Sequence, residues 1–369
     1  MRIGVAYPGG ADDPKGWSGI PAGLLRGLGE AGVVPVSLDP SPGAAAEVAL
    51  KLALAPLYPT DQVRHPGRGL LLAAMGPELV RLRSRTLDRR LRGMALDALV
   101  IPGGLVLPRS EVPLVTYEDM TGPLSKRCGY PLWQALPRRA LHGRVRQQRE
   151  LHRRAVACCT ATGFAADAVE RDYGADPAKI SVVGVGRNHE PVHAERDWSQ
   201  PRFLFVGNEW ERKRGPAVVE AFRRVREVHP NATLDVVSEH PPLRVEGVVG
   251  HGPGRARDEL FARCTCFVMP STVEPAGMVY VEAAAAGAAS IGTSVGGAPE
   301  LIGPGGTVVD PHDQEALVQA MLDLSDPEVA RRLGALAGRH AQQFTWRATA
   351  ERLLAALPDP DLTESACAP

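Results

Sequence analysis

The sequence lacks any run of 18 or more apolar residues, and it has few aromatic residues, few cysteines and only five lysines beside 37 arginines. Without such a run, no segment is long enough to span a bilayer as a helix. The first ten residues, MRIGVAYPGG, look like a strand and lack the charged and apolar regions of a signal peptide, so we expect a cytoplasmic protein. No cysteine has a Cys or His partner at zinc spacing, so we expect reduced, structural thiols.

Charge is balanced overall but not along the chain. Residues 1–200 carry 26 Lys and Arg against 20 Asp and Glu, whereas residues 201–369 carry 16 against 22. This asymmetry is too small for the basic stripe of a nucleic-acid-binding protein, so we expect no nucleic-acid partner. The excess of positive charge on the N-terminal half is compatible with an anionic partner there.

A predicted helix over 133–154 carries cations at helical spacing: His142, Arg146, Arg149 and Arg153. A solvated helix face is the simpler interpretation of this stripe. The alternative is weak contact with a membrane surface or with an acidic acceptor, as basic amphipathic helices provide.

Short runs rich in Val, Ile and Phe alternate with longer helical patterns, which predicts an α/β protein built from βαβ units. A length of 369 residues suits two domains. We expect two doubly wound parallel sheets, facing each other across a cleft. The predicted parts are an N-terminal domain over 1–190, a polar linker over 191–201, a C-terminal domain over 202–343, and a last segment, 344–369, whose helix returns to the first domain before a frayed tail. The predicted strands are 2–7, 33–38, 98–102, 113–116, 155–160, 180–185, 202–207, 233–238, 264–270, 289–293 and 307–310.

The strongest local pattern runs from Glu274 to Glu282, where an apolar strand ends in a loop that leads into a small-residue helix. At the C-terminal edge of an α/β sheet, a helix N-terminus offers unpaired N–H groups and the positive end of its dipole. The backbone amides of Gly277, Met278 and Val279 are therefore candidates to bind a diphosphate. The alternative is that Glu274 only stabilises the helix start and that Glu282 is solvated.

A second strand, ending at Gly207, leads through NEWERKRG to a helix with Pro216 in its first turn. Three adjacent cations, Arg212, Lys213 and Arg214, stand next to that helix start. Cations oppose the dipole there, so an anionic ligand explains them better than helix stability does. A solvated basic turn is the alternative.

These blocks, in their order, resemble the retaining nucleotide-sugar glycosyltransferases of family 4, which have the GT-B fold. The matching segments are FVGNEWERKRG, VVGHGPGRARDELFARC, FVMPSTVEPAGMVYVEAAAAG, GTSVGGAPELI and TVVDPHDQEALVQAM. The resemblance implies transfer of a sugar from a nucleoside-diphosphate sugar, which the C-terminal domain holds, to an acceptor on the N-terminal domain. The acceptor, whether a small molecule, a lipid-linked species or a glycan, stays open.

The resemblance also assigns residues. Glu274 contacts the donor sugar, Glu282 contacts the ribose, and Arg212 and Lys213 bind the diphosphate. Arg214 stands where that pattern usually has glycine, which leaves the register of the cationic pair open by one residue. Two further positions are implied for the donor, Gly207 and Ser238.

The N-terminal half resembles the family less closely. Gly10, Ser18 and Gly19 lie in a loop after the first strand, where the family places a glycine-rich loop near the phosphate and acceptor. Where the family often has histidine, this chain has Glu118 and Asp119, which either orient an acceptor hydroxyl or are ordinary solvated acids.

Other chemistries find less support in the sequence. The only D-x-D pattern considered for a metal, Asp359 and Asp361, lies in a Pro-rich tail away from any predicted strand edge. No G-x-G-x-x-G opens a helix in dinucleotide-binding context. We therefore expect no metal and no cofactor, with protein cations and helix amides stabilising the departing diphosphate. An epimerase on the same fold, a phosphorylase and a non-catalytic sugar-nucleotide binding protein are the alternatives.

Overall fold

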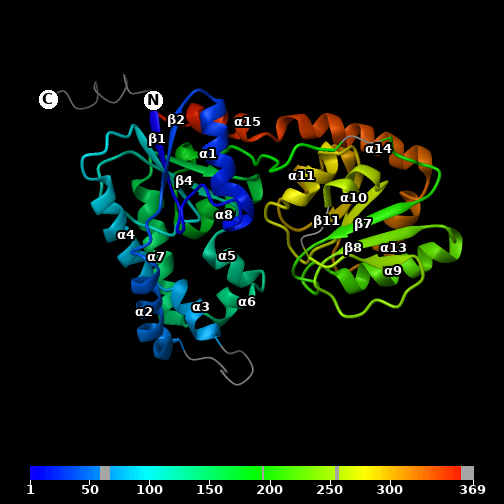
Figure 1. Cartoon of the computed structure of the whole chain (residues 1–369), viewed down its shortest axis with the longest axis horizontal. Helices are drawn as coiled ribbons and strands as arrows, with labels where there is room; N and C mark the ends of the chain where they lie inside the picture. The colour runs from blue at the N-terminus through cyan, green and yellow to red at the C-terminus, as the bar shows by residue number, and fades with distance from the viewer. Residues whose placement is uncertain (59–66, 193–194, 254–256, 359–369) are drawn as a thin grey trace. The chain divides into compact units, whose positions relative to one another are not determined.

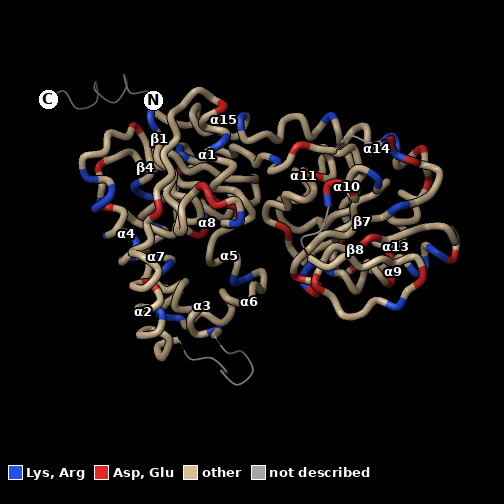
Figure 2. The backbone as a smooth tube through the Cα atoms, viewed as in Figure 1, with Lys and Arg blue, Asp and Glu red and all other residues tan. Residues whose placement is uncertain are grey.

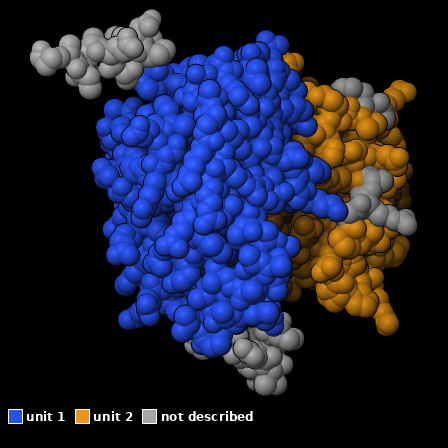
Figure 3. Space-filling model, turned by 60° about the vertical axis from the view of Figure 1, so that its left-hand side comes forward, with its two compact units in different colours: residues 1–185, 346–369 blue, residues 186–345 orange. Residues whose placement is uncertain are grey.

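The computed structural model describes residues 1–58, 67–192, 195–253 and 257–358. The chain divides into two compact units (Figures 1 and 3). Unit 1 comprises Met1–Val185 and the segment from Trp346 onward, and unit 2 comprises Gly186–Thr345. No helix in the described ranges is both long and apolar enough to cross a membrane. Lys and Arg are interspersed with Asp and Glu along both units (Figure 2).

Unit 1 is built on a six-stranded parallel sheet with the order β2-β1-β3-β4-β5-β6. The inner strands β3 and β4 are buried at every position, as expected where helices cover both faces of a parallel sheet. Its strands are β1 (Arg2–Ala6), β2 (Val34–Leu38), β3 (Ala98–Pro102), β4 (Leu114–Glu118), β5 (Ala157–Thr160) and β6 (Ile180–Val182). Its helices are α1 (Ile20–Glu30), α2 (Ala44–Leu54), α3 (Arg68–Ala74), α4 (Pro77–Leu91), α5 (Gly122–Arg127), α6 (Pro131–Ala135), α7 (Arg138–Arg154), α8 (Gly163–Tyr173) and α15 (Trp346–Ala355).

Helix α15 packs against α1, so the C-terminal segment belongs to unit 1 (Figure 1). The fully buried Trp346 lies directly on two glycines of α1. A Cβ atom on Gly23 or Gly27 would come within 2.0 Å of Trp346. These glycines therefore allow the close approach of the two helices.

Unit 2 contains a second six-stranded parallel sheet, with the order β12-β11-β10-β7-β8-β9. Its strands are β7 (Arg202–Val206), β8 (Thr233–Val237), β9 (Val248–Gly250), β10 (Cys266–Met269), β11 (Ala289–Thr293) and β12 (Gly306–Val309). Its helices are α9 (Gly215–Val228), α10 (Arg257–Arg263), α11 (Met278–Ala285), α12 (Ala298–Ile302), α13 (Gln314–Asp323) and α14 (Pro327–His340). In both units the first strand, β1 or β7, is an inner strand with later strands on both of its sides, which is the doubly wound arrangement.

The predicted α/β class with two doubly wound parallel sheets is confirmed, and every predicted strand overlaps an observed one. The short edge strand β9 was not predicted, nor were α2 and α3. The continuous helix expected over 133–154 was wrong, because the chain breaks between α6 and α7. Leu136 is extended there (φ −66°, ψ 125°), as the residue before a proline tends to be, and Pro137 precedes the first turn of α7.

Candidate functional site

The order of strands in unit 2 places two loops at one point of the sheet. Strand β7 lies between β8 and β10. The chain places β8 and β9 on one side of β7 and then β10, β11 and β12 on the other side. The carboxyl ends of parallel strands share one edge, and ligands of doubly wound sheets bind where the order reverses. The loops over 207–214 and 270–277, which follow β7 and β10, flank this switch point.

The loop after β7 is held in shape by Trp210. This side chain packs edge-on against Phe205 and fills the space beside Gly215, where a Cβ atom would lie 2.1 Å from the indole. Arg214, the N-cap residue of α9, has φ +63°, a left-handed conformation that glycine adopts with less strain. The position where the family pattern has glycine is thus one that requires positive φ.

Arg212 and Lys213 both reach from this loop to the loop after β10. Arg212 Nη1 donates to the Val273 carbonyl at 2.9 Å, and its Nε donates to Glu209 at 2.8 Å. Lys213 Nζ forms an ion pair with the Glu274 carboxylate, and both side chains are about nine-tenths buried. The two loops are therefore joined by charged side chains, with both cations at the switch point.

Glu274 is fixed by its backbone as well as by Lys213. Its N–H donates to the Val295 carbonyl at 3.0 Å, and its own carbonyl accepts from Gly297 N at 2.8 Å. Ser271 Oγ donates to its carboxylate at 3.1 Å. The whole residue is 6% exposed, so Glu274 is not a freely solvated acid.

Helix α11 begins at Met278, directly after this loop. Gly277 is its N-cap, and no side chain caps the helix start. A Cβ atom on Gly277 would lie 2.7 Å from both Glu274 Cγ and the Tyr280 ring, so only glycine fits. The first-turn amides at Gly277, Met278 and Val279 therefore stand at the switch point without a side-chain cap, as an anion site requires.

Glu282 lies one turn further along α11 and is buried, so the interpretation of it as a solvated acid was wrong. It is 8% exposed, and its Oε2 has no hydrogen-bond partner among the described residues. Burial raises the pKa of Glu282 to about 7, while Arg257, whose Nη2 is 3.6 Å from Oε1, lowers it.

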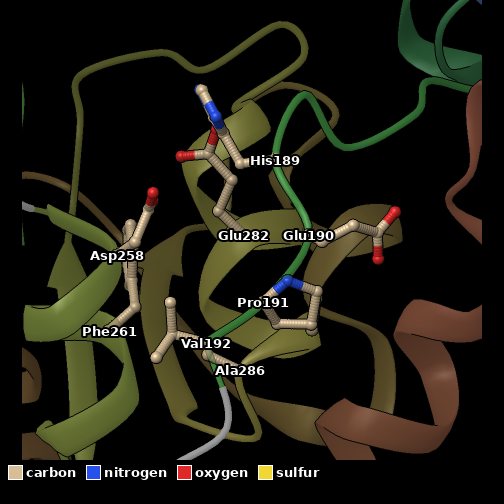
Figure 4. A pocket seen from close by; sticks show the side chains of 9 residues that line it. His189, Glu190, Pro191, Val192, Asp258, Phe261, Glu282 and Ala286 are labelled. Atoms are coloured by element: carbon tan, nitrogen blue, oxygen red, sulfur yellow. The ribbon is translucent and has the colours of Figure 1, made fainter.

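Two neighbours of Glu282 were missed by the sequence analysis. Arg257 opens α10, and its Nη2 is also 3.3 Å from His189 Nε2, in the segment that precedes β7. Figure 4 shows the His189 imidazole beside the Glu282 carboxylate, at a hollow that Asp258 and Phe261 also line. Neither Arg257 nor His189 carries a local sequence signal, because each meets Glu282 only through the tertiary fold.

The two remaining donor candidates are at the same edge of the sheet. Gly207 directly follows β7, and its N–H donates to the Val237 carbonyl at 3.0 Å. Ser238 directly follows β8, is 1% exposed, and donates through Oγ to the Glu239 carbonyl at 3.0 Å. All donor residues named from the sequence therefore lie on loops or helix starts of unit 2 at the carboxyl ends of its strands, with Glu282 inside α11.

The acceptor candidates lie in unit 1. Gly10, Ser18 and Gly19 have φ of +98°, +56° and +79°, so the loop after β1 repeatedly adopts left-handed backbone. Trp17 does so as well, with φ +41°. Glu118 ends β4 and is 2% exposed, so it is not a solvated acid, whereas the adjacent Asp119 is half-buried.

The basic stripe of α7 is exposed, and part of it is engaged locally. Arg149 Nε donates to the Asp172 carbonyl at 3.0 Å, and Arg153 forms an ion pair with Glu150 at 2.7 Å. Contact of Arg146, Arg149 and Arg153 with a membrane surface stays a prediction. Asp359 and Asp361 lie outside the described residues, and within the described ranges no three His, Cys, Asp or Glu residues are grouped as metal ligands.

Two doubly wound units, one with cations and an uncapped helix start at its switch point, define an α/β protein with a candidate anion-binding site. Residues 200–326 match the family model described as Glycosyl transferases group 1. The chain is 38% identical over 132 residues to D-inositol 3-phosphate glycosyltransferase of Streptomyces griseus, which is 34% of this chain and 26% of that protein. It is 32% identical over 214 residues to glycogen synthase of Mycobacterium tuberculosis, which is 52% of each chain. The chain thus spans about half the length of the curated relatives it matches, or less.

Solved structures show the fold over the whole chain. Sucrose-phosphate synthase from Thermosynechococcus elongatus superimposes with a TM-score of 0.68 at 18% identity, over 99% of both chains. WaaG, a glycosyltransferase involved in lipopolysaccharide biosynthesis, superimposes with a TM-score of 0.63 at 16% identity, over 96% of this chain and 98% of its own. The fold is GT-B, as the sequence predicted.

Proposed function

We propose that this protein is a retaining, metal-independent glycosyltransferase of family 4 that takes its sugar from a nucleoside-diphosphate sugar. The observation that carries the proposal is the contact between Lys213 and Glu274, which joins the loops after β7 and β10 at the switch point of unit 2. The match of residues 200–326 to group 1 glycosyl transferases covers the same loops.

The diphosphate is bound by cations and by the start of α11. Arg212 and Lys213 supply positive charge, and the amides of Gly277, Met278 and Val279 supply hydrogen-bond donors at the positive end of the helix dipole. As the glycosidic bond breaks, negative charge grows on the diphosphate, so these contacts strengthen towards the transition state. The protein thereby provides the stabilisation that a divalent cation would otherwise give.

The two glutamates have different roles. Glu274, held against Lys213 beside the diphosphate position, contacts the donor sugar and stabilises positive charge that develops on the ring. Glu282, with an unpartnered buried oxygen, accepts hydrogen bonds from the ribose hydroxyls. Replacing Glu274 with Gln should lower kcat, and replacing Glu282 with Gln should raise the donor KM.

The acceptor binds to unit 1. Relatives are named for inositol phosphate and for glycogen, so their names do not agree on one acceptor. What they have in common is transfer to a polyhydroxylated molecule. We therefore propose a hydroxyl of a sugar or polyol as the nucleophile, with Glu118 and Asp119 at the edge of the sheet that receives it.

The test begins with the full-length protein and the diphosphates of uridine, guanosine, thymidine and adenosine. A ligand that binds only the folded state stabilises it by about 2.7 kcal/mol at 100 times its Kd, so one of the four should raise Tm clearly. Lys213→Ala should clearly reduce the response, whereas Arg146→Ala, on the exposed face of α7 in unit 1, should leave it unchanged. The corresponding nucleotide sugar should then release its diphosphate only when an acceptor is present. No response to any of the four diphosphates would refute the proposal.

A further inference from the structure

A cluster of buried polar side chains lies at the carboxyl edge of the sheet of unit 1, around Gly104. Arg144 and Gln148 are one turn apart on α7, and Glu118 ends β4. Arg144 Nη2 donates to the Gly104 carbonyl at 3.2 Å. A Cβ atom on Gly104 would lie 3.1 Å from both Gln148 Nε2 and Glu118 Oε1. The three side chains thus converge on one glycine peptide.

These side chains have hydrogen-bonding capacity that nothing in the described part of the chain uses. Arg144, Gln148 and Glu118 are each 2% exposed. Arg144 Nε and Nη1, Gln148 Oε1 and Glu118 Oε1 have no hydrogen-bond partner there. Buried polar groups in folded proteins are normally paired, and unpaired ones point to a water, an ion or a ligand.

The cluster also carries positive charge that lacks a counter-ion. Burial raises the pKa of Glu118 well above its usual range, Asp119 raises it further and Arg144 lowers it, so this environment favours the protonated carboxyl. An arginine stays protonated even when buried. The second buried arginine nearby, Arg83 on α4, already pairs with Glu47 at 2.6 Å, although its Nε is unpartnered. In the described ranges Arg144 forms no ion pair, and Glu118 is the carboxyl group that acts on its charge.

We propose that Arg144, with Gln148 and Glu118, binds a phosphate group carried by the acceptor; this inference rests on the proposed function. A guanidinium offers two parallel N–H groups to an oxyanion, and Arg144 has two unpartnered nitrogens. A protonated Glu118 donates a hydrogen bond to a phosphate oxygen, whereas an ionised one would repel it. A phosphate presents enough oxygens for these donors together, and the O–H of a monoprotonated phosphate can donate to Gln148 Oε1, the unpartnered atom of that amide. A carboxylate has only two oxygens and no such donor when ionised.

The loop after β1 stands next to this cluster. The Trp17 ring would be 3.6 Å from a Cβ atom on Gly103 and packs edge-on to Tyr117, with ring centroids 6.3 Å apart. Trp17 and Ser18 both have left-handed backbone, which is strained for residues with a side chain. Because Arg144 is buried, phosphate reaches it by displacing neighbouring side chains, and Trp17 is the neighbour whose backbone gains from moving.

The test is a titration of the full-length protein with inorganic phosphate, followed by calorimetry and Tm. Saturating nucleoside diphosphate, chosen by the screen above, fills the site in unit 2 first, so that phosphate reports only on other sites. Wild type should bind phosphate saturably. Arg144→Met should weaken binding by about tenfold to a hundredfold, the range for a lost charge-assisted hydrogen bond. Arg146→Met, two residues away on the exposed face of α7, should bind as wild type does.

Each outcome decides the inference. Equal phosphate binding by wild type and Arg144→Met, or no binding by wild type, would overturn it. Acetate at matched ionic strength that binds as tightly as phosphate would overturn the choice of phosphate in favour of a carboxylate. If Arg144→Met does not fold, Arg144→Lys and Gln148→Leu replace it. Each variant should bind phosphate more weakly than wild type, and binding equal to that of wild type would refute the inference. A nucleotide response without a phosphate response rejects this inference alone, whereas no nucleotide response rejects the proposed function.

Discussion

The affinity for nucleotide should increase with pH around neutrality, because Glu282 is buried. Burial raises the pKa of Glu282 to about 7, Arg257 lowers it and Asp258 raises it. His189 and Glu190 are the other ionisable groups that line this hollow. In the proposed site, the ionised carboxylate accepts hydrogen bonds from the ribose hydroxyls, and protonation removes acceptor capacity. A group with a pKa of about 7 is roughly one-tenth ionised at pH 6 and nine-tenths ionised at pH 8. Affinity should therefore rise about tenfold over that interval.

Calorimetry with the nucleoside diphosphate at pH 6, 7 and 8 measures this dependence. The phosphate groups of the ligand titrate in the same range, so the matched control is Glu282→Gln, which keeps the shape of the side chain but cannot ionise. The ratio of the two Kd values at each pH isolates the carboxyl group. Parallel profiles for the two proteins, or a ratio that moves in the opposite direction, would refute the role of an ionised Glu282.

The same group should make the protein less stable at high pH. A carboxyl whose folded-state pKa is raised contributes its full stabilisation below the unfolded value of 4.5 and loses it as pH rises through about 7. The difference between these two values, at about 1.36 kcal/mol per pH unit, corresponds to about 3 kcal/mol. Glu282→Gln should thus be more stable than wild type at pH 8 by up to about 3 kcal/mol and close to wild type at pH 5. Urea unfolding at both pH values measures this, and equal stabilities at pH 8 would contradict it.

Three further outcomes follow from the site in unit 2. Lys213→Ala should weaken binding of nucleoside diphosphate by about tenfold or more in calorimetry, and Arg214→Ala much less; similar losses would show that the cationic pair is shifted by one residue. Arg214→Gly should raise the free energy of unfolding by about 1 kcal/mol, because φ is +63° at this position. A loss of stability in urea unfolding would mean that contacts of the Arg214 side chain outweigh the backbone strain. Turnover should persist in excess chelator, and activity that is lost on chelation and restored by manganese would disprove metal independence.

The fold was predictable wherever strands are short apolar runs between helices. Strands such as β3 and β10 are apolar and buried at every position, so hydrophobicity alone identifies them. The prediction missed β9, whose three residues lie at the sheet edge and are at most half-buried. It also missed α2, whose sequence AAAEVALKLAL is apolar nearly all round, so no single apolar face stands out at helical spacing.

The candidate donor residues were identifiable from sequence because a few consecutive residues form the candidate site. In the proposed site Gly277, Met278 and Val279 act through backbone amides at a helix start, and this position follows from the strand, loop and helix pattern. The partners of the two glutamates were not identifiable in the same way. Lys213 reaches Glu274 only because β7 and β10 are adjacent in the sheet, and Arg257, the first residue of α10, meets Glu282 only in the folded chain.

Helix α7 shows what a periodic pattern reveals and what it conceals. The regular spacing of Arg146, Arg149 and Arg153 draws attention to the face that is exposed to solvent. Arg144 and Gln148 are equally polar and lie among these residues in the sequence, yet they share the buried face with Leu151. Polar residues at core spacing are therefore the more informative signal, because a protein buries an arginine without a counter-ion only where something else supplies the missing charge. The proposed phosphate site is therefore at Arg144 rather than on the exposed stripe, and the phosphate titration of the two arginine variants separates these alternatives.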